Sequence, residues 1–484
     1  MLTTEEIKKF LDEDENSKLK QAARVGQRYY DGEHDILDYR MFYFNDNGDL
    51  IEDKYRSNVK IPHPFFTELV DQGTQFVLSG SGDGIIMSED TGLQKHLDLY
   101  FNKNKRFMVE LSETITGMQA KGFDYMYAYK GKDDRLMFEN ADCLGVVEVE
   151  GRFADDGKDQ RIYRYKDRVD KDGKTQWKIL VIDDENTYYY KQADNGTIEN
   201  DDAVQLNPRP HVIYQKDGNL FTKENENKFL PFFRLDNNKK RSSWLKPVKP
   251  LIDDYDLMAS SLSNNLVDFD TPLMVVKGFH GNNLDELQVN RKTKKLMGID
   301  EEGDVDIKTV DIPYQARKEK LDIDKEGIYQ FGMGLNMAGL KDTSATTNIA
   351  IKAAYSLLEL RGNKIIGQVE LLLQQLVEVV LAEINAEEGK SYQMEQVYFT
   401  FTPEIMSNAT ENAQIELTEA QRRQAEINTL LTLAAYLDNE TLMKLICEQL
   451  DIDYEEIKSK LPDPDEATNS IIDAANNLGG GVVE

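Results

Sequence analysis

The chain has 484 residues, of which 40% are hydrophobic and 30% are charged, and this composition predicts a folded protein of two to four domains. Its 88 acidic and 58 basic side chains give a formal net charge of −30. That balance excludes tight non-specific binding of nucleic acid by the whole chain, because such binding depends on lysine and arginine contacts with phosphates.

The cysteine content and the hydropathy pattern bear on the compartment. Only Cys143 and Cys447 occur, so we expect a reducing compartment and no disulfide scaffold. The first residues lack the apolar segment of a signal peptide, and no run approaches the roughly 20 apolar residues of a membrane helix. We therefore expect a soluble protein that is made in a cytoplasm and does not contact a membrane.

The first half of the chain predicts helices followed by a β meander. Helices are expected over about residues 4–30, 65–78 and 92–122, and a hairpin over 43–53 around the turn Asn47-Gly48. Short alternating strands separated by Asp, Gly, Asn and Lys occupy residues 125–214 and predict an antiparallel meander. Residues 229–235 and 237–241 are interpreted as a polar linker.

The central unit predicts two helices that frame a small insert. Residues 250–269 carry one narrow apolar stripe at helical spacing (Leu251, Tyr255, Met258, Leu262, Leu266 and Phe269), with Asp253, Asp254, Ser261 and Asn264 on the opposite side. Residues 271–312 predict a compact, strand-rich insert. The returning helix over 313–331 has apolar residues only every seventh position, so it is either mostly solvated or packs through a partner chain.

A Gly-rich loop at 332–347 leads into a helix far longer than average, at 348–387, in which Gly362 and Gly367 are expected kink points because glycine weakens a helix interior. A strand over 392–402 follows. Three helical segments come next, at about 410–437, 440–450 and 453–461, before Pro462 and Pro464. The Gly-rich C-terminal tail is expected to be disordered.

Catalytic motifs are weak in this sequence. Asp172-Gly173-Lys174-Thr175 matches the end of a phosphate-binding loop, but Arg168 stands where that motif requires glycine, so a hairpin turn is favoured. The five histidines show no metal-ligand spacing and are interpreted as surface or packing residues. We therefore expect no enzymatic activity, no cofactor and no metal site.

The sequence leaves two interpretations open for each of two segments. The segment with Gly334, Leu335, Asn336, Met337, Gly339, Lys341 and Asp342 is either an ordinary helix connection or a mobile loop that contacts a moving partner. The basic cluster of Arg291, Lys292, Lys294 and Lys295 is either a solvated turn or a docking surface for a partner chain.

Several stretches resemble, in the same order along the chain, those of portal proteins, the head-to-tail connectors of tailed double-stranded DNA phages. They include Tyr29-Tyr30-Asp31-Gly32-Glu33-His34, the spaced residues Asn58, Ile61-Pro62, Leu69-Val70-Asp71 and Leu78-Ser79-Gly80, the run from Leu251 to Asp256 followed by Ser260-Ser261 and Asn264-Asn265, Ala350-Ile351-Lys352 with Leu357-Leu358-Glu359-Leu360, and the strand Val397–Pro403. Each match is short, and their shared order carries the resemblance.

The resemblance implies an α+β portal fold with wing, stem, clip and crown regions, assembled as a ring that is usually dodecameric. The wing would be 1–242 with 348–403, and the stem helices would be 243–270 and 313–332. The clip would be 271–312, the tunnel loop 333–347, the crown 404–476 and the disordered tail 477–484.

The resemblance also implies a structural role at one capsid vertex of the virion, after assembly in the host cytoplasm. The ring would be the channel for packaging and ejection of double-stranded DNA. Its partners would be the terminase large subunit, a head-completion adaptor, and capsid and scaffold proteins. An acidic channel would repel DNA and leave it free to slide. Two alternatives stay open: a nucleic-acid-processing enzyme with a helical hinge, and an oligomeric scaffold without a DNA channel.

Overall fold

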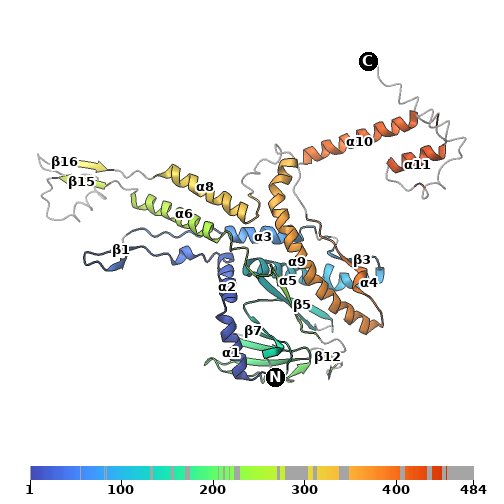
Figure 1. The fold of residues 1–484 in the computed structure, drawn as a ribbon, viewed down its shortest axis with the longest axis horizontal. Helices are drawn as coiled ribbons and strands as arrows, with labels where there is room; N and C mark the ends of the chain where they lie inside the picture. Colours follow the sequence, from blue (N-terminus) through green and yellow to red (C-terminus); the bar gives the residue numbers. More distant parts are fainter. Residues whose placement is uncertain are drawn as a thin grey trace, which may run out of the picture. The chain divides into compact units, whose positions relative to one another are not determined.

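The computed structural model describes residues 2–54, 56–80, 82, 84–130, 135–153, 157–168, 175–204, 206–210, 213–216, 219–222, 229–269, 273–277, 304–308, 313–336, 348–403, 409–432, 436, 439–449 and 454 (Figure 1). The chain divides into two compact units, Met1–Asn336 with Tyr355–Glu404 and Met337–Ala354 with Ile405–Glu484. Each unit is described separately below.

The first unit combines helices with several small sheets. The α-helices are α1 (Thr4–Glu15), α2 (Lys18–Tyr30), α3 (Phe65–Leu78), α4 (Thr91–Leu97), α5 (Lys105–Lys121), α6 (Lys249–Phe269), α8 (Tyr314–Phe331) and most of α9 (Asn348–Glu388). Four short helices accompany them: η1 (Asp35–Asp38), η3 (Asp98–Asn102), η4 (Gly151–Phe153) and η6 (Met394–Gln396).

The antiparallel meander predicted over 125–214 is confirmed for residues 146–200, whereas its first two strands belong to a separate sheet described below. The larger sheet has the order β10-β9-β8-β7-β6, with β11 paired to β9. Its strands are β6 (Val146–Val149), β7 (Gln160–Arg168), β8 (Thr175–Ile182), β9 (Asn186–Gln192), β10 (Ile198–Asn200) and β11 (Arg209–Pro210), and β12 (Ile213–Lys216) pairs separately with β13 (Asn219–Thr222). Arg168 at the end of β7 pairs with Thr175 at the start of β8, and the predicted turn between them lies outside the described residues.

A three-stranded sheet corrects the linker prediction. Its order is β14-β4-β5, from β4 (Phe123–Lys130), β5 (Leu136–Ala141) and β14 (Phe232–Asp236). The stretch interpreted as a polar linker therefore contains a strand, in which Phe232 pairs with Tyr127. Tyr127 lies about a hundred residues earlier in the chain, so no local sequence pattern could predict this pairing.

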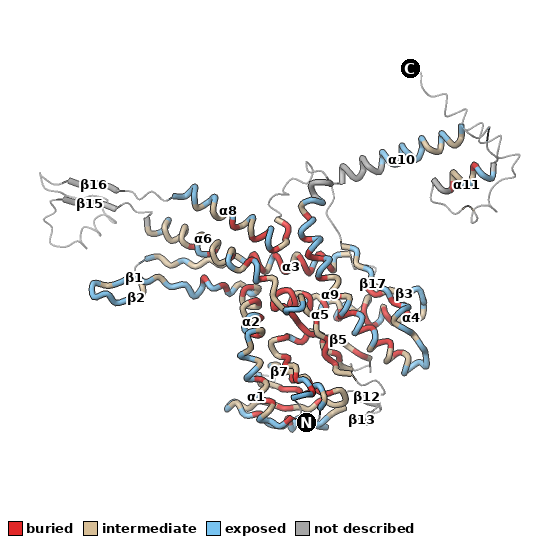
Figure 2. The backbone as a smooth tube through the Cα atoms, in the orientation of Figure 1, coloured by how far each residue is buried: buried red, intermediate tan, exposed pale blue. Residues whose placement is uncertain are grey.

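The main core is built around α9. Its predicted stripe of Val369, Leu373, Leu376, Val380 and Ile384 is buried, packed with residues of α5 and of the three-stranded sheet. By length and composition, Lys352–Glu388 is apolar enough to cross a membrane, so the expectation that no such run occurs was wrong. The burial of this stripe identifies α9 as a core helix of the first unit (Figure 2).

Two predicted helices are interrupted by polar caps. Ser17 accepts a hydrogen bond from the backbone amide of Lys20 (3.2 Å) and starts α2, so the helix expected over 4–30 is two helices. The helix expected over 92–122 is likewise α4, the π-helical η3 and α5, and Asn104 caps α5. A long-range pair of short strands, β3 (Ile86–Ser88) with β17 (Val397–Phe399), ties the chain after α9 back to this region.

The helices α6 and α8 form an antiparallel pair that confirms the two predicted framing helices. Lys320 of α8 reaches Asp254 of α6 at 2.5 Å, and a Cβ at Gly327 would lie 3.3 Å from Leu251, so the helices approach closely. The strands β15 (Leu273–Lys277) and β16 (Asp304–Lys308) pair antiparallel between them in the chain.

The expected hairpin around Asn47-Gly48 is confirmed by the pairing of β1 (Phe42–Phe44) with β2 (Leu50–Glu52). Figure 2 shows it almost wholly exposed. Phe44 is 72% exposed and Leu50 is 60% exposed. An isolated two-stranded hairpin is only marginally stable in water.

The second unit contains α10 (Ala409–Thr432) and α11 (Asn439–Gln449), near two of the predicted C-terminal helices. Leu442 and Cys447 of α11 are buried. Apart from Tyr454, the helix expected at 453–461 and the expected disordered tail lie outside the described residues.

Candidate functional site

An extended segment, residues 57–63, is attached along α6 by a regular series of hydrogen bonds. Its backbone amides at Ser57, Val59, Ile61 and His63 donate to the side chains of Asp268 (3.1 Å), Asn264 (2.6 Å), Ser260 (3.0 Å) and Asp256 (2.9 Å). Two residues of an extended chain span about 6.6 Å and four residues of a helix about 6.0 Å, so the two repeats stay in step. The order of the partners makes the segment antiparallel to α6.

The hydrogen bond from His63 to Asp256 belongs to a cluster of polar side chains around Asp256. Asp256 is fully buried and accepts hydrogen bonds from Nδ1 of both His34 (2.6 Å) and His63 (2.9 Å). The ring of His34 stacks on Tyr29 with centroids 4.6 Å apart. Burial alone would raise the pKa of Asp256, but the hydrogen bonds from the two histidines outweigh it and hold the pKa below its usual value.

With the extended segment on one side and α8 on the other, α6 keeps two open sides. Leu257 and Leu266 are 37% and 52% exposed. They are nine residues apart, and at about 100° per residue this places them on opposite sides of the helix. Each open side of α6 therefore presents an apolar side chain.

The end of α8 and the first residues after it are fixed to α3. Gln72 accepts a hydrogen bond from the amide of Leu335 (2.8 Å) and donates one to its carbonyl (2.9 Å). Leu335 is buried, and a Cβ at Gly334 would lie 2.1 Å from a methyl group of Leu69. The start of the predicted loop is thus packed and hydrogen bonded, and Gly334 permits the close approach.

Arg361 of α9 also contacts the residues that follow α8. Its guanidinium is fully buried and donates to the carbonyl of Gly332 (3.2 Å) and to Oε1 of Gln119 (2.6 Å), and it lies 4.7 Å from the ring of Trp244. Burial lowers the pKa of Arg361 to about 9, so it remains protonated at neutral pH. No ion pair joins it to a carboxylate among the described residues.

The two glycines predicted as kink points have different surroundings. The helix α9 continues through both of them and bends along its length (Figure 1). A Cβ at Gly362 would lie 2.4 Å from the ring of Phe76, whereas a Cβ at Gly367 would meet nothing within 4 Å. Gly362 thus serves close packing of α9 on α3.

These surroundings predict opposite effects for the same substitution. Gly362→Ala should destabilise the fold by about 1–3 kcal/mol, because Phe76 is buried and has to shift. Gly367→Ala should stabilise it by about 0.5–1 kcal/mol, because alanine is the better helix former. Urea unfolding of both variants checks the pair, and equal signs would contradict the assignment.

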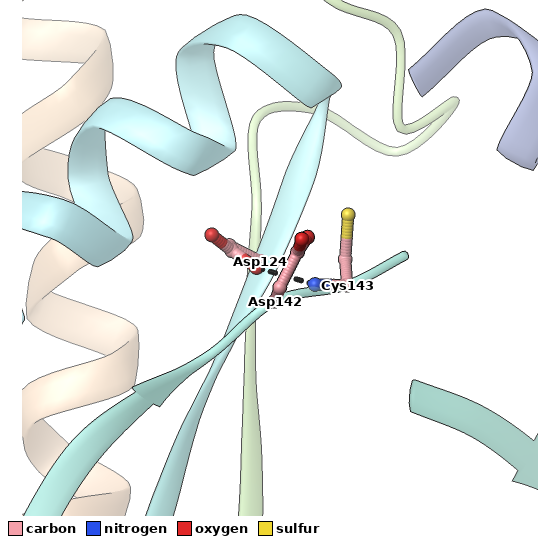
Figure 3. A group of neighbouring side chains, drawn as sticks. All are labelled: Asp124, Asp142 and Cys143. Atoms are coloured by element: carbon pink, nitrogen blue, oxygen red, sulfur yellow. Dashed lines mark hydrogen bonds between the residues drawn. The ribbon is translucent and has the colours of Figure 1, made fainter. Parts of the chain in front are cut away.

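A group of carboxylates and a thiol, Asp124, Asp142 and Cys143, is close enough to suggest a metal site (Figure 3). Lys121 already bridges the carboxylates, with its Nζ 2.9 Å from Asp124 and 2.8 Å from Asp142. Asp124 also accepts a hydrogen bond from the backbone amide of Cys143 (2.7 Å; Figure 3).

The ionisation of this group fits a satisfied internal ion pair. Burial raises the pKa of Asp124 to about 6, against the attraction of Lys121. The two carboxylates hold the pKa of Lys121 above its usual value, and burial raises the pKa of the Cys143 thiol. A protonated lysine and a neutral thiol are poor surroundings for a divalent cation, so we assign the group a structural role.

Comparison with known proteins identifies the family. A family model described as phage portal protein, SPP1 Gp6-like, matches residues 9–458. This chain belongs to that family of phage portal proteins.

Individual relatives agree with that assignment. The portal protein of Bacillus phage SPP1 is 27% identical over 367 residues, which cover 74% of this chain and 68% of that protein. The portal protein of Clostridium phage phiCD119 is 30% identical over 191 residues, 38% of this chain and 41% of that protein.

Two solved structures are also similar. The neck of an empty GTA particle, computed with C6 symmetry, has a TM-score of 0.36 at 14% identity and covers 79% of this chain and 90% of that one. The neck of a native GTA particle, computed with C12 symmetry, has a TM-score of 0.35 at 13% identity, with the same coverage.

The residues predicted from the resemblance to portal proteins are only partly within the described chain. Gly334, Leu335 and Asn336 are described, whereas Met337, Gly339, Lys341 and Asp342 are not. The basic cluster of Arg291, Lys292, Lys294 and Lys295 also lies outside the described residues.

Sequence reasoning missed the attachment of α6. It interpreted His34 and His63 as surface or packing residues and did not pair them with Asp256, which both contact. The available signal was the run of polar residues at every fourth position of α6, from Asp256 to Asp268, which lies on one side of the helix.

Proposed function

We propose that this portal-family chain forms a ring, usually of twelve copies, that is the channel for packaging and ejection of double-stranded DNA at one vertex of the phage capsid. The observation that carries the ring is the pair of leucines, Leu257 and Leu266, exposed on opposite sides of α6. In a cyclic ring every subunit has one neighbour on each side, so both exposed sides become buried.

The charge of the chain supports the channel. With a net charge of −30 per subunit, a ring of these chains is strongly acidic. DNA carries about one negative charge per 1.7 Å of axis, so an acidic wall repels it from all sides and does not hold it. The ring has a structural role, and the terminase supplies the chemical energy for packaging.

Particle symmetry tests the proposal. Purified full-length chain examined by negative-stain electron microscopy and native mass spectrometry should give closed rings with a central hole. A chain that stays monomeric at micromolar concentration would overturn the ring. ATP turnover or DNA cleavage by the purified chain would instead favour the processing enzyme, and closed rings that do not support packaging would favour a scaffold without a DNA channel.

The loop after α8 is the proposed contact with DNA. Because Gly334 and Leu335 are fixed to α3, a deletion that tests the loop should spare them and remove residues 337–342. We expect rings of normal size and a sharp fall in DNA packaged or retained, measured by nuclease-protected DNA in an assembly reaction. Gln72→Ala is the companion variant that keeps the loop and loosens its start; unchanged packaging by the deletion would refute the role.

The insert between α6 and α8 is the proposed docking site for terminase and the head-completion adaptor. Reversing the charge of Arg291, Lys292, Lys294 and Lys295 should weaken pull-down of either partner and leave ring formation unchanged, because complementary charge mainly steers association. Four lysine-to-glutamate changes on exposed helix surfaces elsewhere provide the control. Equal partner binding by wild type and variant would exclude this surface.

A further inference from the structure

Two charged pairs of α8, Lys318 with Lys325 and Glu319 with Glu326, define a basic side and an acidic side of the helix. Lys318 and Lys325 are seven residues apart, two helical turns, and so lie on one side with Tyr314. Glu319 and Glu326 have the same spacing and lie about 100° further round, on the side of Ile323. Tyr314 and Ile323 are 55% and 65% exposed.

The packing of α8 on α6 leaves both sides free. The residues of α8 that meet α6 include Lys320, paired with Asp254, and Gly327, close to Leu251. Lys318, Glu319 and Glu326 are exposed and Lys325 is half-buried. Within the part of the chain that the structure describes, no ion pair involves Lys318, Lys325 or Glu326.

The two sides match each other in register. Both pairs repeat over about 10.5 Å of helix axis, and the acidic pair is shifted from the basic pair by one residue, about 1.5 Å. Cyclic symmetry keeps the copies of α8 at the same height and at the same tilt to the ring axis. For an α8 that runs along this axis, two neighbouring copies bring Lys318 opposite Glu319 and Lys325 opposite Glu326 with almost no stagger.

We propose that the basic side of α8, formed by Lys318 and Lys325, docks against the acidic side, formed by Glu319 and Glu326, of a second copy of this chain. The inference rests on the proposed ring and identifies one of its subunit contacts. Tyr314 and Ile323 supply apolar surface beside the charges. The contact is heterologous, because one subunit uses its basic side while its neighbour uses its acidic side.

Charge exchange tests the contact. The all-acidic variant Lys318→Glu/Lys325→Glu and the all-basic variant Glu319→Lys/Glu326→Lys each place like charges opposite one another. Each alone should need about tenfold or more higher protein concentration to form rings, measured by mass photometry at low salt. Lys8→Glu/Lys9→Glu on α1 is the matched control, since both lysines are exposed and the change in net charge equals that of the all-acidic variant.

Mixing gives the decisive measurement. In an equimolar mixture, the acidic variant can dock only with the basic one, so native mass spectrometry should find rings in which the two alternate in equal numbers. A chain with all four exchanges should form rings by itself again. Circular dichroism confirms that each variant is folded, as expected for substitutions on an open helix surface.

The outcomes separate the contact from the ring. Rings of wild type and of both charge variants at the same concentration would overturn the contact and leave the proposed ring standing. Failure of the mixture and of the fourfold exchange to assemble, when both single-sign variants are folded, would also overturn it. A wild-type chain that never forms rings would remove both the ring and the contact.

Discussion

Replacing Asp256 by alanine is expected to lower the free energy of unfolding by about 3–5 kcal/mol, because three hydrogen-bond donors lose their buried acceptor. Asp256 is fully buried and accepts from the side chains of His34 and His63 and from the His63 amide. Without the carboxylate, the buried His34 ring faces an empty site. The extended segment also loses the innermost of its four bonds to α6.

The neighbouring Asp254 provides the matched control. It lies two residues away on α6 and its side chain is 45% exposed, paired with Lys320. Asp254→Ala should cost less than about 1 kcal/mol, since exposed ion pairs contribute little. Urea unfolding of the two variants side by side checks the difference, and similar losses would mean that the histidine cluster does not stabilise the fold.

The same cluster predicts a dependence on pH. The pKa of Asp256 is lower in the folded chain than in the unfolded chain, where aspartate titrates near about 3.9. Its stabilising contribution is therefore complete above that value and is lost as the pH falls through the lower, folded pKa. The difference in stability between wild type and Asp256→Ala should shrink below about pH 4.

The second large effect is expected at Arg361. Arg361→Leu should lower the free energy of unfolding by about 2–4 kcal/mol, because the carbonyl of Gly332 and Oε1 of Gln119 lose their donor while buried. Lysine keeps the positive charge but has one nitrogen in place of the two guanidinium nitrogens that reach Gly332 and Gln119. Arg361→Lys should therefore be more stable than Arg361→Leu but less stable than wild type. Thermal and urea unfolding measure both.

Lys364 is the control for this prediction. It lies three residues further along α9, its Nζ is 6.0 Å from the ring of Trp244, and it is exposed. Lys364→Leu should change stability by no more than about 0.5 kcal/mol. If Lys364→Leu were as damaging as Arg361→Leu, the contact with Trp244, and not the link to Gly332, would be the stabilising feature.

Local sequence patterns were sufficient for much of the secondary structure of this portal-family chain. The turn at Asn47-Gly48 and the long helix stripe through Val369 and Leu376 each depend on neighbours in the chain, and both are confirmed. The helix breaks at Ser17 and Asn104 were missed because the apolar spacing is helical on both sides of each residue. The side chain of each residue caps the helix that follows it, which starts a new helix there.

Long-range contacts of the candidate site were beyond such patterns. The partners of Asp256 are His34 and His63, some two hundred residues earlier, and the donor to Gly332 is an arginine of α9. The order of motifs shared with portal proteins predicts a loop after α8 but could not show that Gln72 is hydrogen bonded to Leu335. The sequence alone does not distinguish a glycine that bends a helix from one that, like Gly362, allows close packing against Phe76.

The exposed β1–β2 hairpin has a consequence for the newly synthesised subunit. By strand alternation, Phe42, Phe44 and Leu50 share one face of the ribbon, and a free subunit shows that face and two open strand edges to water. Exposed apolar edge strands are templates for aggregation. If the proposed ring covers this face, a cell that makes the chain faster than rings assemble should accumulate insoluble chains, so expression yield should depend on synthesis rate as much as on stability.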